Sequence, residues 1–437
     1  MEVKRKVVFG AATALLSVGM LAGCGSASST SNSSGGSNSS TSNSSGGSSG
    51  SSSGGTVTIV SLRATSGPAA SLGVPGNNAL QMAVDALNAK GGLLGKKVVL
   101  KVLNTESTPS LASTLTRQAI QQDHAVALFG GVSSGDGAYE VPDAKKFHKI
   151  LFSYTFNDAV FTRTSQYTPY FFSLVPNTDM EPMAAALAFK QNGWTKIYTI
   201  SPNYNYGRAE VNGFLAALKK VGVHYTLVGQ QWPALGAPSF TSNISAILAA
   251  HPQAVFGGIY GSDLLTFTKE AEGYNLFKKT HMVAQWGSVD LQALGSQAPY
   301  GAIGFSRGGW WTLTSQHPQV TTWANQYHTK YGSWPSAYSM LGTKAFDAWV
   351  YGVKKANSFN STKVSQALAG ATIPTIFGSY KIRAADHQAE IPEYIGVISN
   401  KGQSKFGFAQ YNPTIDASWN NIKEAPPTKA QLQSSGN

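Results

Sequence analysis

From Thr56 onward, hydrophobic positions alternate between short β-rich runs and longer stretches in which apolar residues recur at helical spacing. The short runs predict strands at 56–62, 98–103, 125–129, 150–154, 196–200, 224–229 and 254–259. The longer stretches predict helices over 78–90, 110–122, 139–147, 179–191, 207–221, 241–250 and 263–272. Strands that alternate with helices in this way predict parallel sheets of βαβ units. The two successive runs therefore predict an α/β protein with two doubly wound, Rossmann-like lobes and a ligand cleft at the carboxyl ends of their strands.

The first 55 residues do not follow this alternation. A basic start, Lys4-Arg5-Lys6, precedes an apolar run over 7–21, and the run closes with Leu21-Ala22-Gly23-Cys24. This is the pattern of a secretory signal, and its last four residues resemble the bacterial lipobox, whose cysteine is acylated. We expect residues 1–23 to be a lipoprotein signal peptide and Cys24 to carry the lipid. Two acyl chains hold a protein on a bilayer, so we expect the protein to be extracytoplasmic and anchored to the cell membrane.

Residues 25–55 are almost wholly Ser, Gly, Asn and Thr. Such a segment cannot bury apolar area, so we expect 24–55 to form the lipidated cysteine and a flexible tether. Cys24 is the only cysteine in the sequence, and its acylation leaves no thiol for a disulfide or a metal. The apolar run at the start is too short to span a membrane, and no later stretch approaches the roughly 20 residues required.

The charge balance narrows the possible partners. The chain carries a formal net charge of +12, and removal of three cations and one anion with residues 1–23 leaves +10. The basic residues form scattered pairs such as Lys96-Lys97 and Lys219-Lys220 with no arginine-rich stripe, which argues against nucleic acid as a partner. Charged residues make up only 12% of the chain, against about 25% in a typical protein. A shortage of carboxylates suggests a protein that faces an acidic medium.

Several short motifs follow one another in an order that resembles a known family. They are Val57–Leu62 with Ser66-Gly67-Pro68, Ala83–Gly92, Gly95-Lys96-Lys97-Val98, Gly130–Ser134, Tyr204–Gly207 and Gly258-Ile259-Tyr260. Over about 57–399, the chain resembles the branched-chain amino-acid-binding proteins, type I periplasmic binding proteins that feed ABC importers. The resemblance implies two lobes joined by three crossing segments. It places lobe 1 at 56–174 and 308–375, lobe 2 at 175–307 and 376–420, and a tail at 421–437.

Two loops of lobe 1 are candidates for ligand binding. Ser133 and Ser134 lie between a strand and a helix, where free amide groups and the helix dipole favour a carboxylate. The resemblance implies that Ser134 binds the ligand carboxylate, whereas the structural alternative is an ordinary N-cap. Thr155 and Asn157 match the second clamp of the family, with an Asx turn as the alternative.

Lobe 2 contributes aromatic candidates. Tyr206 and Tyr260 match tyrosines that cover the ligand on closure, and core or rim packing is the alternative for both. Amino-acid binders of this family place a carboxylate after a strand of lobe 2 to pair with the ligand ammonium, and the matching position here is Trp286. A buried ammonium without a counter-charge is costly. The ligand is then a carboxylate with an apolar or aromatic body or a cation held by cation–π contact, unless Asp136 or Asp158 supplies the charge for an amino acid.

An alternative function as an enzyme is suggested by Gly131–Gly135, which also matches the G-x-S-x-G motif of a nucleophile elbow. A serine hydrolase would need a downstream acid and histidine, for which Asp386-His387 is the candidate. The family match explains the same glycines and serines as a carboxylate cradle, so we expect no enzyme. The eight histidines include no i, i+4 pair and the chain has no P-loop, so neither a metal site, nor another cofactor, nor ATP hydrolysis is expected.

Together these patterns predict a solute-binding lipoprotein of an ABC importer. It would act as a monomer, capture a small carboxylate-bearing solute (an amino acid or an aromatic or apolar acid) by cleft closure, and deliver it to a permease with its ATPase subunits. A ligand-sensing lipoprotein that serves a membrane receptor would have the same lobes and cleft, so this alternative remains open.

Overall fold

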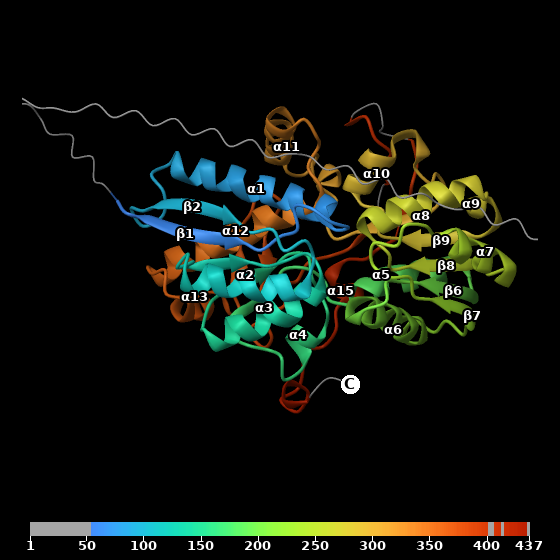
Figure 1. The fold of residues 1–437 in the computed structure, drawn as a ribbon, viewed down its shortest axis with the longest axis horizontal. Helices are drawn as coiled ribbons and strands as arrows, with labels where there is room; N and C mark the ends of the chain where they lie inside the picture. Colours follow the sequence, from blue (N-terminus) through green and yellow to red (C-terminus); the bar gives the residue numbers. More distant parts are fainter. Residues whose placement is uncertain (1–53, 401–405, 412–414, 435–437) are drawn as a thin grey trace, which may run out of the picture. The chain divides into compact units, whose positions relative to one another are not determined.

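The computed structural model describes residues 54–400, 406–411 and 415–434 (Figure 1). The predicted signal peptide, the predicted lipidation site Cys24 and nearly all of the predicted tether lie outside the described residues. Across the described part of the chain, no helix combines the length and apolar character that a membrane crossing requires.

Lobe 1 is built on a five-stranded parallel sheet with the order β2-β1-β3-β4-β5. Its strands are β1 (Thr56–Ser61), β2 (Lys97–Val102), β3 (Ala127–Phe129), β4 (Leu151–Ser153) and β5 (Phe171–Ser173). Strands β3 and β4 lie inside the sheet and β5 lies at its edge. All three are buried along their whole length, as expected for a parallel sheet with both faces covered.

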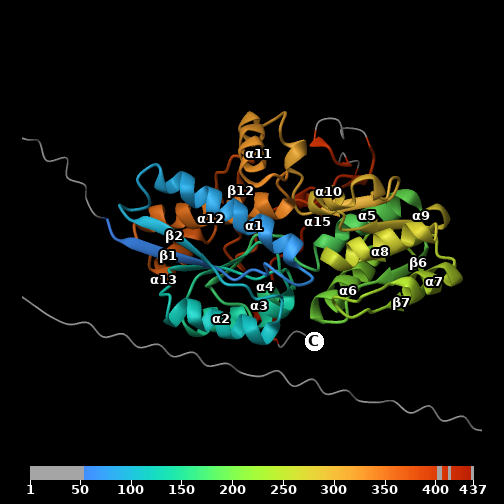
Figure 2. The same ribbon diagram turned by 45° about the horizontal axis from the view of Figure 1, so that its top comes forward.

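Helices cover both faces of this sheet (Figures 1 and 2). Along β1 the side chains alternate, so that Ile59 packs in one core cluster and Val60 in another. The Ile59 side is covered by α1 (Ala70–Asn88) and α12 (Ala337–Ala356), and the Val60 side by α2 (Pro109–Gln121) and α3 (Ser134–Lys146). Two further helices of this lobe are α4 (Val160–Arg163) and α13 (Ser361–Leu368), and α13 packs against α12.

Lobe 2 contains a six-stranded sheet with the order β13-β10-β9-β8-β6-β7, parallel except for β13. Its strands are β6 (Lys196–Ile200), β7 (Thr226–Gln231), β8 (Ala254–Gly257), β9 (His281–Ala284), β10 (Ile303–Ser306) and β13 (Tyr394–Val397). One face packs on α5 (Glu181–Asn192) and α6 (Asn205–Lys220), and the other on α7 (Thr241–Ala250) and α8 (Gly261–Gly273). The remaining elements of this lobe include α9 (Leu276–Lys279), α10 (Ser288–Leu294) and α15 (Trp419–Ile422), which packs against α5. Helix α11 (Pro318–Tyr331) follows β10 and contacts α1 of lobe 1.

The chain passes between the lobes three times: after β5, after β10 and before β13. The short pair β11 (Thr372–Ile373) and β12 (Tyr380–Lys381) is antiparallel, and Tyr380, Ile382 and Ala389 belong to the core of lobe 1. The last crossing therefore comes after these residues. The predicted fold class, α/β with two doubly wound parallel lobes, is confirmed.

Candidate functional site

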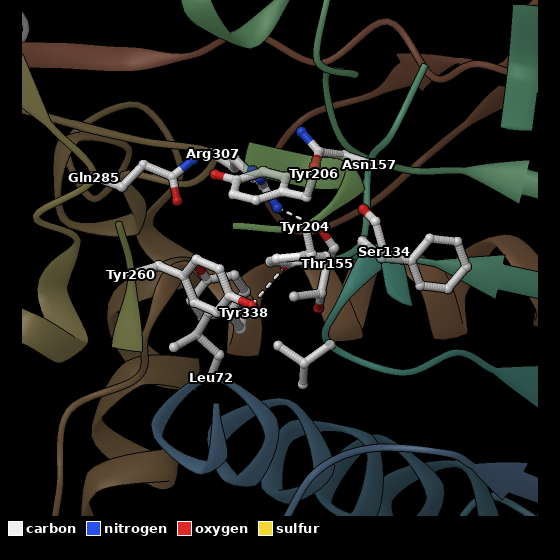
Figure 3. Close-up of a pocket in the computed structure, with 12 residues that line it drawn as sticks. Leu72, Ser134, Thr155, Asn157, Tyr204, Tyr206, Tyr260, Gln285, Arg307 and Tyr338 are labelled. Atoms are coloured by element: carbon white, nitrogen blue, oxygen red, sulfur yellow. Dashed lines mark hydrogen bonds between the residues drawn. The ribbon is translucent and has the colours of Figure 1, made fainter. Parts of the chain in front are cut away.

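A cavity lies between the two lobes, beyond the carboxyl ends of the strands (Figure 3). The space in it that no atom fills, counted up to its opening to solvent, is about 250 Å³. Its wall comes from α1, from the starts of α3, α6 and α12, and from the loops that follow β3, β4, β6, β8, β9 and β10. The lining residues are Leu72, Val132, Ser134, Thr155, Phe156, Asn157, Tyr204, Tyr206, Tyr260, Gln285, Arg307 and Tyr338.

Hydrogen bonds join the lobes beside the cavity. Asn205, the first residue of α6, donates from Nδ2 to Asp158 Oδ2 at 3.1 Å and to the Ser134 carbonyl at 3.4 Å. At the start of α8, the Ser262 amide donates to the Pro68 carbonyl at 3.1 Å. Two separate loops of lobe 2 thus contact lobe 1, and the lobes are closed on one another.

The two serines at the start of α3 have different environments. Ser133 is the N-cap, and its Oγ accepts a hydrogen bond from the Asp136 amide at 3.1 Å. Ser134 lines the cavity, and its Oγ accepts from the Asp158 amide at 3.3 Å. The N-cap alternative therefore describes Ser133, whereas the hydroxyl of Ser134 and the N-terminal end of α3 are available to a ligand.

No carboxylate is among the residues that line the cavity. Asp136 and Glu140 lie behind the β3–α3 loop, where Asp136 accepts from Thr105 Oγ1 at 3.1 Å and Glu140 accepts from the Gly131 amide at 3.0 Å. Burial raises the pKa of Asp136 to about 6 and raises the pKa of Glu140 well above its ordinary value. Asp158 accepts from Asn205, and its pKa is also raised by burial. Neither Asp136 nor Asp158 is therefore placed as a wall residue for an ammonium group.

Thr155 and Asn157, on the loop after β4, both line the cavity. The Thr155 hydroxyl accepts from Arg63 at 2.5 Å. Asn157 donates from Nδ2 to the Pro176 carbonyl at 3.0 Å and to Glu181, while its Oδ1 has no partner within the described residues. Asn157 therefore keeps one free acceptor in the wall of the cavity.

A buried ion pair between Arg307 and Glu181 lies beside the cavity. Arg307, directly after β10, donates from Nε to Glu181 Oε1 at 3.0 Å and from a terminal nitrogen to Oε2 at 2.6 Å. It also donates to the Thr155 carbonyl. Arg307 follows β10, Glu181 begins α5 and Thr155 belongs to lobe 1, so this bidentate pair joins both lobes beside the cavity.

Tyrosines form most of the aromatic wall. Tyr204 and Tyr260 share a hydrogen bond between their hydroxyl groups at 2.7 Å, and Tyr206 meets Tyr260 edge to face with ring centroids 5.6 Å apart. Tyr338 enters from the start of α12 (Figure 3). Tyrosine supplies both an apolar face and a polar hydroxyl, so this wall suits a solute with an apolar body and polar atoms.

Trp286 does not line the cavity. Its side chain is fully buried in the core of lobe 2, its indole nitrogen donates to Thr268 Oγ1 at 2.9 Å, and its ring meets Phe277 edge to face. The preceding residue, Gln285, faces the cavity instead. Successive side chains at a strand end point to opposite sides, so Trp286 follows Ala284 into the core and the aromatic pocket expected around it is formed by tyrosines.

The residues of the hydrolase alternative are not assembled here. His387 stacks on Phe172 in the core of lobe 1 with ring centroids 4.2 Å apart, and burial lowers its pKa to about 4. Asp386 is paired with Arg383. No histidine is among the lining residues of the cavity, and among the described residues no group of His, Cys, Asp and Glu is arranged to hold a metal ion.

Residues 56–403 match the profile of the periplasmic binding protein family. The chain belongs to this family. It is a type I periplasmic binding protein of the branched-chain amino-acid-binding group, as its motifs indicated.

Relatives agree with this assignment. The chain is 25% identical over 373 residues to "Leu/Ile/Val-binding protein homolog 4" of Brucella abortus, covering 81% of this chain and 86% of the relative. A periplasmic binding protein from Burkholderia mallei has the same fold, with a TM-score of 0.77, 19% identity and coverage of 87% and 98%. A solute-binding protein of an ABC transporter from R. palustris, solved in complex with benzoate, has a TM-score of 0.74, 20% identity and coverage of 83% and 97%.

Several wall residues of this periplasmic binding protein were not among the sequence-based candidates. Leu72, Tyr204 and Tyr338 are ordinary apolar or aromatic letters in the sequence, and nothing local distinguishes them from core residues. Arg63 and Arg307 were also missed, because arginine is normally exposed. Arg63 lies two residues after β1 and Arg307 directly after β10, and these positions are the signal that was available, since ligands bind beyond strand ends.

Proposed function

We propose that this protein is an extracytoplasmic solute-binding lipoprotein of an ABC importer. In this proposal it captures a small carboxylate-bearing solute, either an amino acid or an aromatic or apolar acid, by closure of its two lobes and presents the closed form to the permease. The observation that carries the proposal is the cavity itself, which both lobes line and which hydrogen bonds from Asn205 and Ser262 close. A ligand that bridges the lobes shifts the population toward this closed form.

Three features support a small acid as the ligand. The hydroxyl of Ser134 and the N-terminal end of α3 face the cavity, where an anion is favoured. The tyrosines and Leu72 offer apolar area for the body of the solute. The relative from Brucella abortus is named for leucine, isoleucine and valine, and the R. palustris structure holds benzoate, so both ligand classes occur among similar proteins.

The residue roles follow from these positions. Ser134, Thr155 and Asn157 hold the polar end of the solute from lobe 1, while Tyr206 and Tyr260 cover it from lobe 2. Gln285 takes the position assigned to Trp286 from the sequence, and Ser133 supports the binding loop as the N-cap of α3. Acylated Cys24 and the tether keep the body at the membrane, where the monomer meets the permease and ATPase subunits.

The first experiment is a binding screen on the chain without its predicted signal peptide, residues 24–437. Calorimetry and tryptophan fluorescence follow titration with aliphatic amino acids, aromatic acids and short carboxylates, and small-angle X-ray scattering follows closure. We expect saturable binding of at least one acid together with a more compact scattering profile. Stimulation of ATP hydrolysis by the reconstituted permease complex then separates an importer from a receptor.

A variant at Asn205, which bonds the two lobes to one another, tests the closure mechanism. Asn205→Ala removes the hydrogen bonds to Asp158 and Ser134 without touching the cavity wall, and a lost hydrogen bond of about 1 kcal/mol weakens binding roughly five-fold. Asn203→Ala is the matched control, because Asn203 is exposed and its side chain bonds only to Arg208 within lobe 2. No saturable binding of any solute, with unchanged compactness, would overturn the proposed function.

A further inference from the structure

Arg63 is a buried cation next to the cavity. It lies two residues beyond the end of β1 and has no exposed surface. Its guanidinium donates to the Leu72 carbonyl at 2.8 Å, to the Gly73 carbonyl at 3.4 Å and to Thr155 Oγ1 at 2.5 Å. It also lies over the ring of Tyr154, 4.1 Å from the centroid. All of its partners are therefore formally neutral.

The other buried arginines have carboxylate partners. Within the described residues three arginines are buried: Arg307 pairs with Glu181, Arg383 pairs with Asp386, and Arg63 has no ion pair. Asp136 and Glu140 attract Arg63 electrostatically without forming an ion pair with it, and they bond instead to Thr105 and to the Gly131 amide. Leaving a buried charge without a partner is costly. An anion in the adjacent cavity would compensate it.

The contact with Thr155 connects this cation to the ligand space. Because Arg63 donates to the Thr155 oxygen, the hydroxyl proton of Thr155 must point elsewhere. The Thr155 carbonyl is already occupied by Arg307, and the Thr155 side chain lines the cavity. The hydroxyl therefore offers a donor to the cavity, and a donor polarised by a cation prefers an anionic acceptor.

We infer that the cavity selects a carboxylic acid without an ammonium group, and that Arg63 sets this selectivity by polarising the Thr155 hydroxyl. The inference rests on the proposed function and narrows its two ligand classes to one. Gln285, on the wall, is uncharged, and no lining residue is a carboxylate. An amino acid would find no carboxylate on the wall to pair with its ammonium group, and its carboxylate would gain nothing over that of a simple acid. Arg63 is a positioning residue that acts through Thr155.

Matched ligand pairs test the selectivity directly. Leucine and 4-methylpentanoate differ in the ammonium group, and benzoate and benzamide differ in the negative charge. Calorimetry on residues 24–437 should show that whichever acid fits binds roughly 100-fold more tightly than its counterpart. Leucine binding as tight as that of 4-methylpentanoate would overturn this inference and leave the proposed function standing. Absence of binding by every solute of the wider screen would instead overturn the proposed function.

Variants test the route through Thr155. Arg63→Gln should weaken acid binding by about 10- to 100-fold and leave amide binding almost unchanged, and Arg63→Lys should restore part of the preference for the acid. Thr155→Val should reduce the acid-to-amide ratio similarly, and Arg63→Gln added to Thr155→Val should reduce it little further. Arg383→Gln, at another buried arginine, is the control and should leave the ratio unchanged.

Circular dichroism and thermal melts establish that each variant folds. If Arg63→Gln does not fold, Thr155→Val and Thr155→Ser carry the test, because serine keeps the hydroxyl that valine lacks. A Thr155→Val protein that keeps the full acid-to-amide ratio would overturn the proposed route. Additive losses for Arg63→Gln and Thr155→Val would also overturn it, because they would mean that the two residues act independently.

Discussion

At the scale of single residues, the end of β9 places two adjacent side chains in opposite environments. Gln285 faces the cavity, and its Nε2 has no hydrogen-bond partner within the described residues. Trp286 fills the core of lobe 2 and donates to Thr268. The two adjacent side chains therefore lie on opposite sides of the backbone, one on the cavity wall and one in the core.

This separation gives a prediction for a pair of variants. Trp286→Phe removes the indole donor and part of a packed ring, so we expect the free energy of unfolding to fall by about 1–3 kcal/mol, while ligand affinity changes less than about two-fold. Gln285→Ala should do the opposite, with weaker binding and little change in unfolding. Urea denaturation and calorimetry measure the two effects. A Trp286→Phe protein of normal stability with strongly weakened binding would contradict the placement.

The sequence could identify loops of the site better than individual side chains. Ser134, Thr155, Asn157, Tyr206 and Tyr260 all reach the cavity because each follows a strand whose carboxyl end faces the cleft. Matching a sequence motif gives no information on side-chain direction, so the motif placed Trp286 in the cavity wall instead of its neighbour Gln285. The charged residues beside the cavity could not be predicted, because a buried guanidinium is stabilised only by partners far away in the sequence.

At the scale of elements, the start of α3 places a capping serine directly before a serine that lines the cavity. Ser133 accepts the Asp136 amide and so satisfies one of the free N–H groups of the first turn. Ser134 presents its hydroxyl to the cavity. The helix end is thereby stabilised by one serine and kept open to a ligand by the next.

We therefore expect the two alanine substitutions to separate stability from binding. Ser133→Ala should lower the free energy of unfolding by about 1 kcal/mol, the usual loss for an N-cap, with a smaller effect on affinity. Ser134→Ala should weaken ligand binding and leave unfolding nearly unchanged. Thermal melts with and without ligand distinguish the two outcomes. Equal effects of both variants on both quantities would show that the loop acts as one unit.

Local periodicity predicted most of the alternating strands and helices up to residue 272, but it did not predict β5, β9, β10 or the long helix α12, nor all of the limits. The helix expected over 78–90 begins at Ala70 in the structure. The sequence pattern predicts its start too late, because Gly73, Pro75 and Gly76 interrupt the apolar spacing of the first turns. The packing of α12 against α1 joins segments distant in sequence. Such contacts arise from tertiary packing, which no local pattern contains.

At the scale of the whole molecule, scarce carboxylates are combined with deep burial of many of those present. Burial raises the pKa of Asp136 to about 6 and the pKa values of Asp290 and Asp347 to about 7. These three residues lie on α3, α10 and α12, so the effect is spread over both lobes. Glu140, Glu210 and Glu393 are shifted in the same direction by burial. Each of these groups prefers its neutral form in the folded protein.

Such groups make stability depend on pH in a direction opposite to common acid denaturation. An aspartic acid whose pKa is raised from 3.8 to about 7 binds more protons in the folded than in the unfolded state between these values. Its contribution is therefore complete below the unfolded pKa and is lost as the pH rises through the folded pKa. His387 opposes this trend, because burial lowers its pKa to about 4 and stability is lost below its unfolded value of 6.5.

Because the buried carboxyl groups outnumber this histidine, we expect the free energy of unfolding to increase on the order of 2 kcal/mol from pH 8 to pH 5. Urea denaturation at fixed ionic strength measures it. Asp290→Asn should reduce the slope of the free energy of unfolding against pH by up to the contribution of one proton. The asparagine side chain keeps an oxygen that accepts from the Gly287 amide, but it does not titrate. A steep loss of stability between neutral and mildly acid pH would contradict both the pKa directions and the suggestion that this protein faces an acidic medium. A higher free energy of unfolding at acid pH would indicate that protonation of the buried carboxyl groups stabilises the folded state of this sparsely charged protein.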